Sequence, residues 1–411
     1  MKVTERFLKY VSYPTGSEEG TGTNPSTPKQ LVLSTILSEE LSSLGLQCDG
    51  VDGKGYVYAT LPATVVGGND IGFIAHVDTA PDAPDSPVRA SVVEYNGEDI
   101  ILNREENILL SEREYPSLAR YRGEHLVVTD GKTLLGADDK AGIAEIMTML
   151  ERVVSENIPH GKISVAFTPD EEIGAGADYF DLEKFGADYA YTVDGGTLGE
   201  VEYETFNAAA AKITVNGVSI HPGSAKGKMK NAARILCDFN ALLPPAEIPE
   251  KTEGYEGFHH MTSFEGRCES ATASYIIRDH DRALFEEKKE AFRIAAARIN
   301  EIWGEGTLLL TLNDSYYNMG EIVEKNMFTV DRARQAMLKA GVTPHTVPIR
   351  GGTDGARLSF MGLPCPNLST GGENFHSRFE YVSVLSMEKM VDCLVEIVRD
   401  AGMLERESTV V

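Results

Sequence analysis

The chain has 411 residues, with 38 Lys and Arg against 63 Asp and Glu, which gives a formal net charge of −25 at pH 7. This length predicts a large buried core and two domains. Nucleic acids and anionic membrane surfaces would repel so acidic a chain, and we exclude both as partners.

The cysteines and the first residues indicate a cytoplasmic protein. The five cysteines are odd in number and show no C-x-x-C spacing, which is typical of reduced thiols rather than of a disulfide framework. The opening stretch MKVTERFLKYVSY has no apolar core followed by a small-residue cleavage site, so we expect no signal peptide. No run of about 18 apolar residues is present, so we expect no transmembrane helix.

The first half of the chain alternates strand and helix patterns. YVYATLP and IGFIAHVD predict strands at 56–62 and 71–78, and helical periodicity runs from Lys140 to about Val154. ISVAFTPDE at 163–171 and DYAYTVDGG at 188–196 predict two more strands, each ending in acidic residues. Strands that alternate with helices predict an α/β layer with a mostly parallel sheet.

The pattern changes near Thr205. The following segments predict strand, helix, strand, strand, helix and strand, at 210–218, 231–242, 259–266, 271–279, 284–303 and 307–314. This β-α-β-β-α-β order is that of a ferredoxin-like α+β domain.

After about Asp314 the alternation of strands and helices returns. Helices are predicted at 328–340 and 386–400, with a strand at 366–370 between them. We therefore predict a discontinuous α/β domain formed by residues 1–206 and 315–411. A smaller α+β domain of residues 207–314 is inserted in it.

Metal-binding residue types recur just after the apolar segments of the larger domain. They are His76 and Asp78, Asp138 and Asp139, Glu171 and Glu172, Asp194, and His376. Ligands of open α/β sheets gather beyond the carboxyl ends of strands, so these segments can meet in space. Imidazole and carboxylate groups suit zinc, and this set can hold two ions if one carboxylate bridges them. One acid must stay unligated to move protons, and in a Glu-Glu pair the two side chains diverge.

Each motif alone also has an ordinary structural explanation. Glu-Glu pairs usually lie on solvated surface, and an acidic pair before a helix complements the helix dipole. An aspartate before two glycines can begin a turn. Their coincidence after apolar strands is what favours a metal site.

In order and spacing, these motifs resemble the M20 metallopeptidase family. The matching segments include IGFIAHVDTAPD, LLGADDKAGIAEI, FTPDEEIGAGAD, HPGSAKGKMKNA and RGGTDGARLSFMGLPCPNLSTGG, and the resemblance extends over essentially the whole chain. It implies an α/β fold, with a zinc-exopeptidase-type catalytic domain and an inserted ferredoxin-like α+β lid and dimerisation domain. It further implies a homodimer formed through the insertion.

The family resemblance also implies the metal ligands, with two Zn²⁺ per chain. His76 and Asp194 would hold one ion, Glu172 and His376 the other, and Asp138 would bridge them. Cobalt or manganese would accept the same ligands.

Three neighbouring acids would have supporting or catalytic roles in the family pattern. Glu171 would be the general base and then the general acid. Asp78 would accept a hydrogen bond from the other ring nitrogen of His76. Asp139 would support the turn, with a cis peptide between Asp138 and Asp139.

Three further residues are candidates for substrate binding. His221 in SIHPG matches a histidine that family members present to the partner subunit's active site, although a His-Pro-Gly alone is more typical of a plain turn. Arg278 and Arg350 are candidates for binding the substrate carboxylate, because guanidinium groups suit carboxylates. Each arginine is equally compatible with a structural ion pair.

The activity implied by the resemblance is hydrolysis of the N-terminal bond of short peptides, preferentially tripeptides. A zinc-bridged hydroxide would attack, with Glu171 as general base. The same metal chemistry serves carboxypeptidases, dipeptidases and N-acyl-amino-acid deacylases, which remain alternatives. A non-catalytic peptide-binding protein is a further alternative, although binding alone does not need Glu171.

Overall fold

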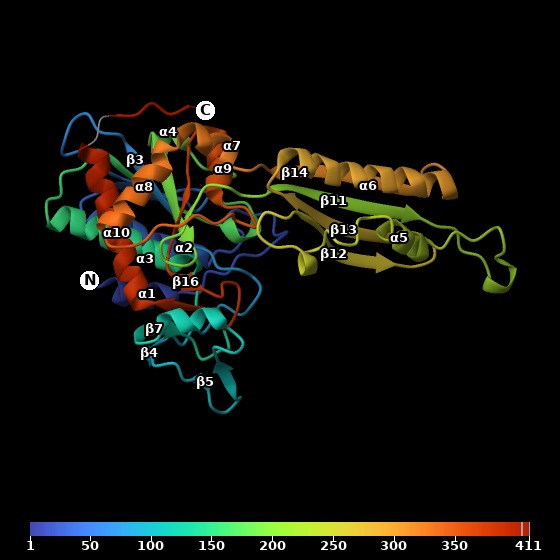
Figure 1. Cartoon of the computed structure of the whole chain (residues 1–411), viewed down its shortest axis with the longest axis horizontal. Coiled ribbons are helices and arrows are strands. Elements are labelled where there is room, and N and C mark those ends of the chain that lie inside the picture. The colour runs from blue at the N-terminus through green and yellow to red at the C-terminus, as the bar shows by residue number, and fades with distance from the viewer. Residues whose placement is uncertain (404–405, 411) are drawn as a thin grey trace. The chain divides into compact units, whose positions relative to one another are not determined.

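The computed structural model describes residues 1–403 and 406–410, and the chain forms two compact units (Figure 1). The larger unit consists of Met1–Tyr203, Glu321–Val347 and Thr353–Val411, and the smaller unit of Glu204–Gly320 and Pro348–Gly352. The sequence places the insertion at 207–314 and gives no sign of the last segment. That segment joins the smaller unit through a bridge between Thr205 and Ile349.

A seven-stranded sheet is the centre of the larger unit. Its order is β1-β2-β8-β3-β9-β15-β10. Strands β3, β8, β9 and β15 run parallel to their neighbours in that group, while β2 and β10 pair antiparallel. The bounds are β1 Gln47–Val51, β2 Val57–Leu61, β3 Ile71–His76, β8 Ile163–Thr168, β9 Tyr189–Gly195, β10 Val201–Glu202 and β15 Asn367–Ser369. The predicted parallel arrangement is confirmed for the central strands, whereas the sheet as a whole is mixed, because β1 also pairs antiparallel with β2.

Helices cover both faces of this sheet. Helix α3 (Ala137–Ser155) lies on β3 and β9, and it packs against α1 (Val3–Val11) and α10 (Val384–Met403). Because α3 is enclosed between sheet and helices, it is buried almost all round, as its run from Ala141 to Leu150 shows. Helix α8 (Phe328–Lys339) packs on α10 (Figure 1).

The other helices of the larger unit are shorter or peripheral. Helices α4 (Leu182–Phe185) and α9 (Asp354–Met361) share a buried cluster with Ile74 of β3. Helix α2 (Gln30–Ser43) packs on β1 and β2. Short helical segments are η1 Pro116–Tyr121, η2 Glu171–Ile173, α7 Gly320–Val323 and η5 Glu324–Asn326, while η3 Pro222–Ser224 and η4 Pro249–Lys251 belong to the smaller unit.

A second, four-stranded sheet in the larger unit is not predicted from the sequence. Its order is β16-β17-β7-β4, with bounds β16 Gly372–Glu373, β17 Tyr381–Ser383, β7 Glu124–Val128 and β4 Ser91–Tyr95. A hairpin of β5 (Ile100–Asn103) and β6 (Ile108–Leu110) lies in the same segment of the chain. Because His376 lies between β16 and β17, this sheet fixes the loop that carries it.

The smaller unit has the predicted β-α-β-β-α-β order. Its antiparallel sheet has the order β12-β13-β11-β14, and helices α5 and α6 contact each other and the sheet. The core contains Ile213, Leu236, Ile277 and Phe292. The bounds are β11 Asn207–Asn216, α5 Ala232–Asn240, β12 Phe258–Gly266, β13 Ser270–Asp279, α6 Arg282–Trp303 and β14 Leu308–Tyr316. Among the described residues, no helix has the length and apolar character that a membrane span requires.

Candidate metal centre

The predicted site segments follow parallel strands of the seven-stranded sheet. Strand β3 ends at His76, β8 ends three residues before Glu171, and Asp194 is the second-last residue of β9. Parallel strands end at the same edge of a sheet, so these side chains converge there. Asp138 reaches the same edge from the start of α3.

Two groups of possible metal ligands share Asp138. His76 Nε2 lies 2.8 Å from Asp138 Oδ1 and 3.3 Å from Asp194 Oδ1. His376 Nε2 lies 2.9 Å from Glu172 Oε2 and 3.4 Å from Asp138 Oδ2. In each group, the ligand atoms lie within 4.8 Å of one another. Asp138 thus offers one carboxylate oxygen to each group, which is the arrangement of a bridging ligand.

The electrostatics of the two groups fit bound cations. Burial raises the pKa of Glu172 to about 7 and that of Asp194 to about 7, and the neighbouring Asp138 charge adds to both shifts. Hydrogen bonds to Asp138 and Glu172 raise the pKa of His376 to about 11. The raised pKa values of Glu172 and Asp194 indicate that too little positive charge lies near these carboxylates to balance them. In addition, Glu172 Oε1 is buried with no hydrogen-bond partner among the described residues. Zinc-type ions would supply both the charge and the missing partner.

Asp78 supports the segment that carries Glu171 and Glu172. It is fully buried, and its carboxylate accepts the backbone N–H of Glu171 at 3.0 Å and of Glu172 at 3.2 Å. Nδ1 of His76 lies 3.1 Å from the backbone oxygen of Asp78 and 3.4 Å from its Oδ1. The backbone oxygen is therefore the nearer partner of the imidazole, with the predicted carboxylate just beyond it.

Glu171 belongs to neither group of possible ligands. It begins the single turn η2, in which successive side chains point about 120° apart, so Glu172 reaches His376 while Glu171 does not. Burial and the nearby Asp194 charge raise the pKa of Glu171 well above its ordinary value. A partly buried carboxyl group with a raised pKa is suited to accept and return a proton.

The second residue of the Asp-Asp pair supports the turn. Asp139 is fully buried and accepts the backbone N–H of His76 at 3.2 Å and of Gly142 at 3.2 Å. The peptide between Asp138 and Asp139 is cis, as predicted.

Asp170, just before the Glu-Glu pair, is a supporting residue that sequence analysis does not single out. Its buried carboxylate accepts hydrogen bonds from Asn24 Nδ2 at 3.1 Å, Ser26 N at 2.7 Å and Gln30 Nε2 at 2.7 Å. Its φ is 60°, in the left-handed region that a non-glycine residue rarely adopts and that is common near active sites. Only its place beside the Glu-Glu pair could have signalled it in the sequence.

The three candidate substrate-binding residues lie in the smaller unit. His221 is exposed before η3, where its Nδ1 accepts the N–H of Gly223. Arg278 Nη1 donates to the carbonyl oxygens of Ala209 and Ile277.

Arg350 is held by the loop between η4 and β12. Its Nη1 donates to the carbonyl oxygens of Gly254 at 2.7 Å and Glu256 at 2.8 Å, and its Nη2 donates to Thr252 Oγ1 at 3.0 Å. Both terminal nitrogens of Arg350 thus have local partners, which favours a structural role.

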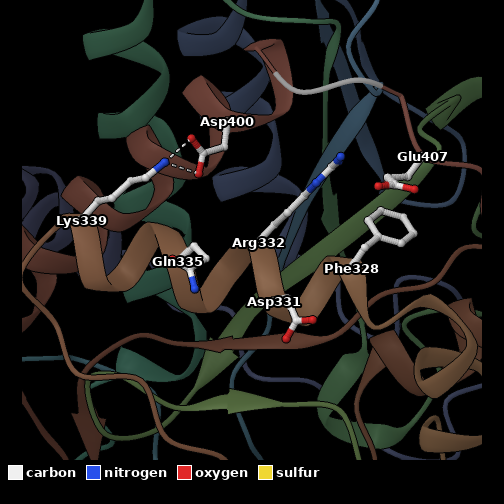
Figure 2. Close-up of a pocket in the computed structure, with 7 residues that line it drawn as sticks. All are labelled: Phe328, Asp331, Arg332, Gln335, Lys339, Asp400 and Glu407. Carbon is white, nitrogen blue, oxygen red and sulfur yellow. Dashed lines mark hydrogen bonds and ion pairs between the residues drawn. The ribbon is translucent and has the colours of Figure 1, made fainter.

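A separate pocket lies along α8 and contains none of the predicted site residues. Its volume is about 610 Å³, and two of its lining residues, Lys339 and Asp400, form an ion pair (Figure 2). The lining residues are Phe328, Asp331, Arg332, Gln335, Lys339, Asp400 and Glu407. This lining carries both signs of charge and no histidine, so the metal centre is the better candidate for catalysis.

Known families match parts of the chain. The M20 "Peptidase dimerisation domain" matches residues 203–306, and the "M42 glutamyl aminopeptidase" family matches residues 124–236. The first match falls on the smaller unit and its entry.

Two solved structures share the fold. Aminopeptidase PepT from Bacillus cereus ATCC 10987 has a TM-score of 0.76 and 24% identity, covering 97% of this chain and 98% of that one. The YXEP protein of Bacillus subtilis, described as a dinuclear metal binding peptidase from the M20 family, has a TM-score of 0.65 and 12% identity, covering 97% and 96%.

The sequence itself has much closer relatives. Peptidase T of Clostridium novyi (strain NT) is 53% identical over 399 residues, which is 96% of this chain and 98% of that protein. At this identity over nearly the whole length, the chain belongs to the peptidase T family.

Proposed function

We propose that this chain is a metallo-aminopeptidase that hydrolyses the first peptide bond of short peptides, preferentially tripeptides. The observation that carries the proposal is the sharing of Asp138 between two ligand groups, with Glu171 outside both. The close relatives named peptidase T support this activity over carboxypeptidase, dipeptidase or deacylase activity.

We propose Zn²⁺ as the metal, with two ions per chain, and with Co²⁺ or Mn²⁺ as substitutes. His76, Asp138 and Asp194 would hold one ion, and Asp138, Glu172 and His376 the other. Bound zinc ions supply Lewis acidity and a nucleophile derived from water at neutral pH.

Glu171 moves the protons of the reaction. Its carboxylate takes a proton from the attacking water and passes it to the leaving amine, and burial favours this by raising its pKa. Asp78 supports the step by holding the backbone N–H of Glu171.

The substrate is bound at its two ends. The excess of carboxylates in the larger unit suits the cationic α-amine of a free peptide. At the other end, Arg278 or Arg350 would bind the terminal carboxylate, and His221 would donate to the oxyanion in the partner subunit's site. A dipeptide falls short of such an anchor by about 3.3–3.6 Å, and a tetrapeptide exceeds it by as much.

We further propose a cytoplasmic homodimer formed through the inserted domain. The M20 dimerisation-domain match supports the dimer, and the five cysteines, none in a disulfide, support the compartment. The high negative charge speaks against nucleic-acid and membrane partners.

The test is kcat/KM for Ala₂, Ala₃ and Ala₄, with acetyl-Ala₃ and amidated Ala₃ as controls. We expect Ala₃ to be cleaved best. Because Ala₃ gives alanine and Ala₂ whichever bond is cut, the cleaved end is identified with a tripeptide of three different residues, which should release its N-terminal residue. Equal turnover of acetyl-Ala₃, or release of the C-terminal residue of the mixed tripeptide, would contradict the aminopeptidase assignment.

A further inference from the structure

Glu380 lies outside both groups of possible metal ligands, yet its carboxylate is one of the most heavily hydrogen-bonded groups of the larger unit. It is 2% exposed. Its Oε2 accepts the backbone N–H groups of Leu135 and Gly136, each at 2.8 Å, and its Oε1 accepts the N–H of Asp138 at 3.0 Å. Three N–H donors from residues 135–138 thus converge on one side chain from a distant part of the sequence.

These hydrogen bonds satisfy backbone N–H groups at the start of α3. Gly136 is the N-cap residue of α3 and has no side chain with which to cap the first turn of the helix. With φ of 79°, Gly136 turns the backbone so that neighbouring N–H groups face the same point, forming an anion-binding concavity. Glu380 fills it, and the hydrogen bonds offset the free-energy cost of burying its charge.

The same side chain also fixes the loop that carries His376. Glu380 lies four residues after His376, its backbone N–H donates to the oxygen of Ser377 at 3.2 Å, and β17 begins at the next residue. His376 has φ of 59°, so its backbone depends on its surroundings to stay in place. Glu380 is therefore attached at one end to the His376 loop and at the other to the Asp138 loop.

We propose that Glu380 is a positioning residue that sets the distance between Asp138 and His376, and so the affinity of the ligand group these two share with Glu172. The inference rests on the metal-ligand roles given under the proposed function. The first group depends on Glu380 only through Asp138, because His76 and Asp194 belong to β3 and β9. The second group depends on it through both Asp138 and His376. Loss of Glu380 should therefore weaken the second ion more than the first.

The variant Glu380→Gln tests this with little change of volume. The amide keeps one acceptor oxygen and places an NH₂ group against N–H donors. Either the N–H of Asp138 or the N–H groups of Leu135 and Gly136 therefore lose their acceptor. Losing such a supporting partner typically lowers metal affinity 10–100-fold. We expect that loss for the second Zn²⁺, with the first Zn²⁺ bound several-fold more weakly at most.

Zinc titration of the metal-free protein against a competing chelator measures both affinities, and the Co²⁺ absorption spectrum reports the geometry. The matched control is Glu145→Gln, which makes the same change at a fully buried carboxyl group of α3. Neither oxygen of Glu145 has a hydrogen-bond partner in the described chain, and we expect wild-type zinc affinities. Wild-type affinity for both ions in Glu380→Gln, or equal loss of both, would overturn the proposal.

A shorter side chain decides the case if Glu380→Gln does not fold. Glu380→Asp keeps the charge and withdraws it by one methylene, and we expect an intermediate loss confined to the second ion. A folded Glu380→Asp with two wild-type affinities would contradict the proposal. A destabilised Glu380→Asp whose melting temperature excess zinc does not raise would also contradict it, because selective loss leaves the first ion bound. Peptide turnover distinguishes the role of Glu380 from the proposed function. If Glu380→Gln selectively loses the second ion but the wild type does not hydrolyse tripeptides, the proposed function is wrong and the role of Glu380 stands.

Discussion

The carboxylate of Asp78 accepts the backbone N–H of Glu171 at 3.0 Å. It also accepts the N–H of Glu172 at 3.2 Å, so one buried side chain fixes the backbone of two consecutive glutamates for which we propose different roles. Asp78 Oδ1 in turn lies 3.4 Å from Nδ1 of His76. Glu171, proposed for proton transfer, and the proposed metal ligands Glu172 and His76 therefore share one support, and changes at Asp78 should affect metal binding and catalysis differently.

Glu171→Gln should bind two zinc ions and lose peptide hydrolysis. General acid–base catalysis contributes about 10²–10⁴-fold, and here one residue serves both proton transfers. Metal analysis and kcat with Ala₃ on the same preparation give the result, with Glu183→Gln on the surface of α4 as control. If the variant loses metal instead, the roles of Glu171 and Glu172 are exchanged.

Asp78→Asn should weaken zinc binding about 10–100-fold and lower kcat as well. The amide retains one acceptor oxygen, so one of the N–H groups of Glu171 and Glu172 loses its partner. Zinc titration and kcat on the metal-saturated enzyme separate the two effects. Asp238→Asn, an exposed change on α5, is the control. A variant with normal zinc affinity and normal kcat would show that Asp78 has neither role.

His221→Ala should mainly lower kcat, by roughly 10²–10³ if the imidazole donates to the oxyanion. If it acts in the partner subunit's site, mixing it with Glu171→Gln under subunit exchange should restore part of the activity. A mixed dimer then contains one site with both residues intact. No recovery in any mixture would mean that His221 does not act across the dimer.

Arg278 and Arg350 should respond differently to replacement by alanine. Arg278→Ala should raise KM for Ala₃ and abolish the preference of the enzyme for free over amidated Ala₃. Arg350→Ala should chiefly lower the melting temperature, because both terminal nitrogens of Arg350 bond to the loop at 252–256. If Arg350→Ala instead loses the preference at an unchanged melting temperature, Arg350 is the carboxylate anchor.

Zinc should stabilise the protein more as the pH rises from about 5 to about 8. In the metal-free protein, burial raises the pKa of Glu172 from 4.5 to about 7 and that of Asp194 from 3.8 to about 7. Between the ordinary and the raised values the folded state binds more protons than the unfolded state, so its stability falls as the pH rises. Zinc replaces these protons, and its apparent affinity therefore increases with pH.

Melting temperatures with saturating zinc and with EDTA, measured across this pH range, test the point. The gap between the two curves should widen toward higher pH. In Asp194→Asn, the metal-free curve should be flatter, because one of the titrating groups is gone. A gap that does not change with pH would contradict the linkage.

The elements that the sequence predicts are those with local periodicity. The buried strands β3, β8 and β9 are continuous apolar runs, and α3 and α6 are long enough to show a helical repeat, so their existence and type are confirmed. The four-stranded sheet of the larger unit, β16-β17-β7-β4, is not predicted, because β17 has only three residues and pairs with β7, far away in the sequence. Such a strand is specified by its partner rather than by its own pattern.

The residues of the candidate site also differ in how far the sequence predicts them. The possible ligands fall in motifs whose order and spacing match a family, and the structure brings these side chains together at one edge of the sheet. Asp170 and Glu380 are single acids without a spacing signal. Their importance comes from the N–H groups that surround them, and the fold alone supplies those groups.

The smaller unit begins with β11 and its long segment ends with β14, and these two strands pair directly, with Ala208 opposite Tyr316. The two ends of this segment therefore lie close together within the smaller unit. To the seven-stranded sheet, the segment Glu204–Gly320 is equivalent to a single long loop, and insertions of that kind are well tolerated. Replacement of this segment during evolution, by another domain or by a short turn, would therefore leave the order and direction of strands β3, β8 and β9 unchanged.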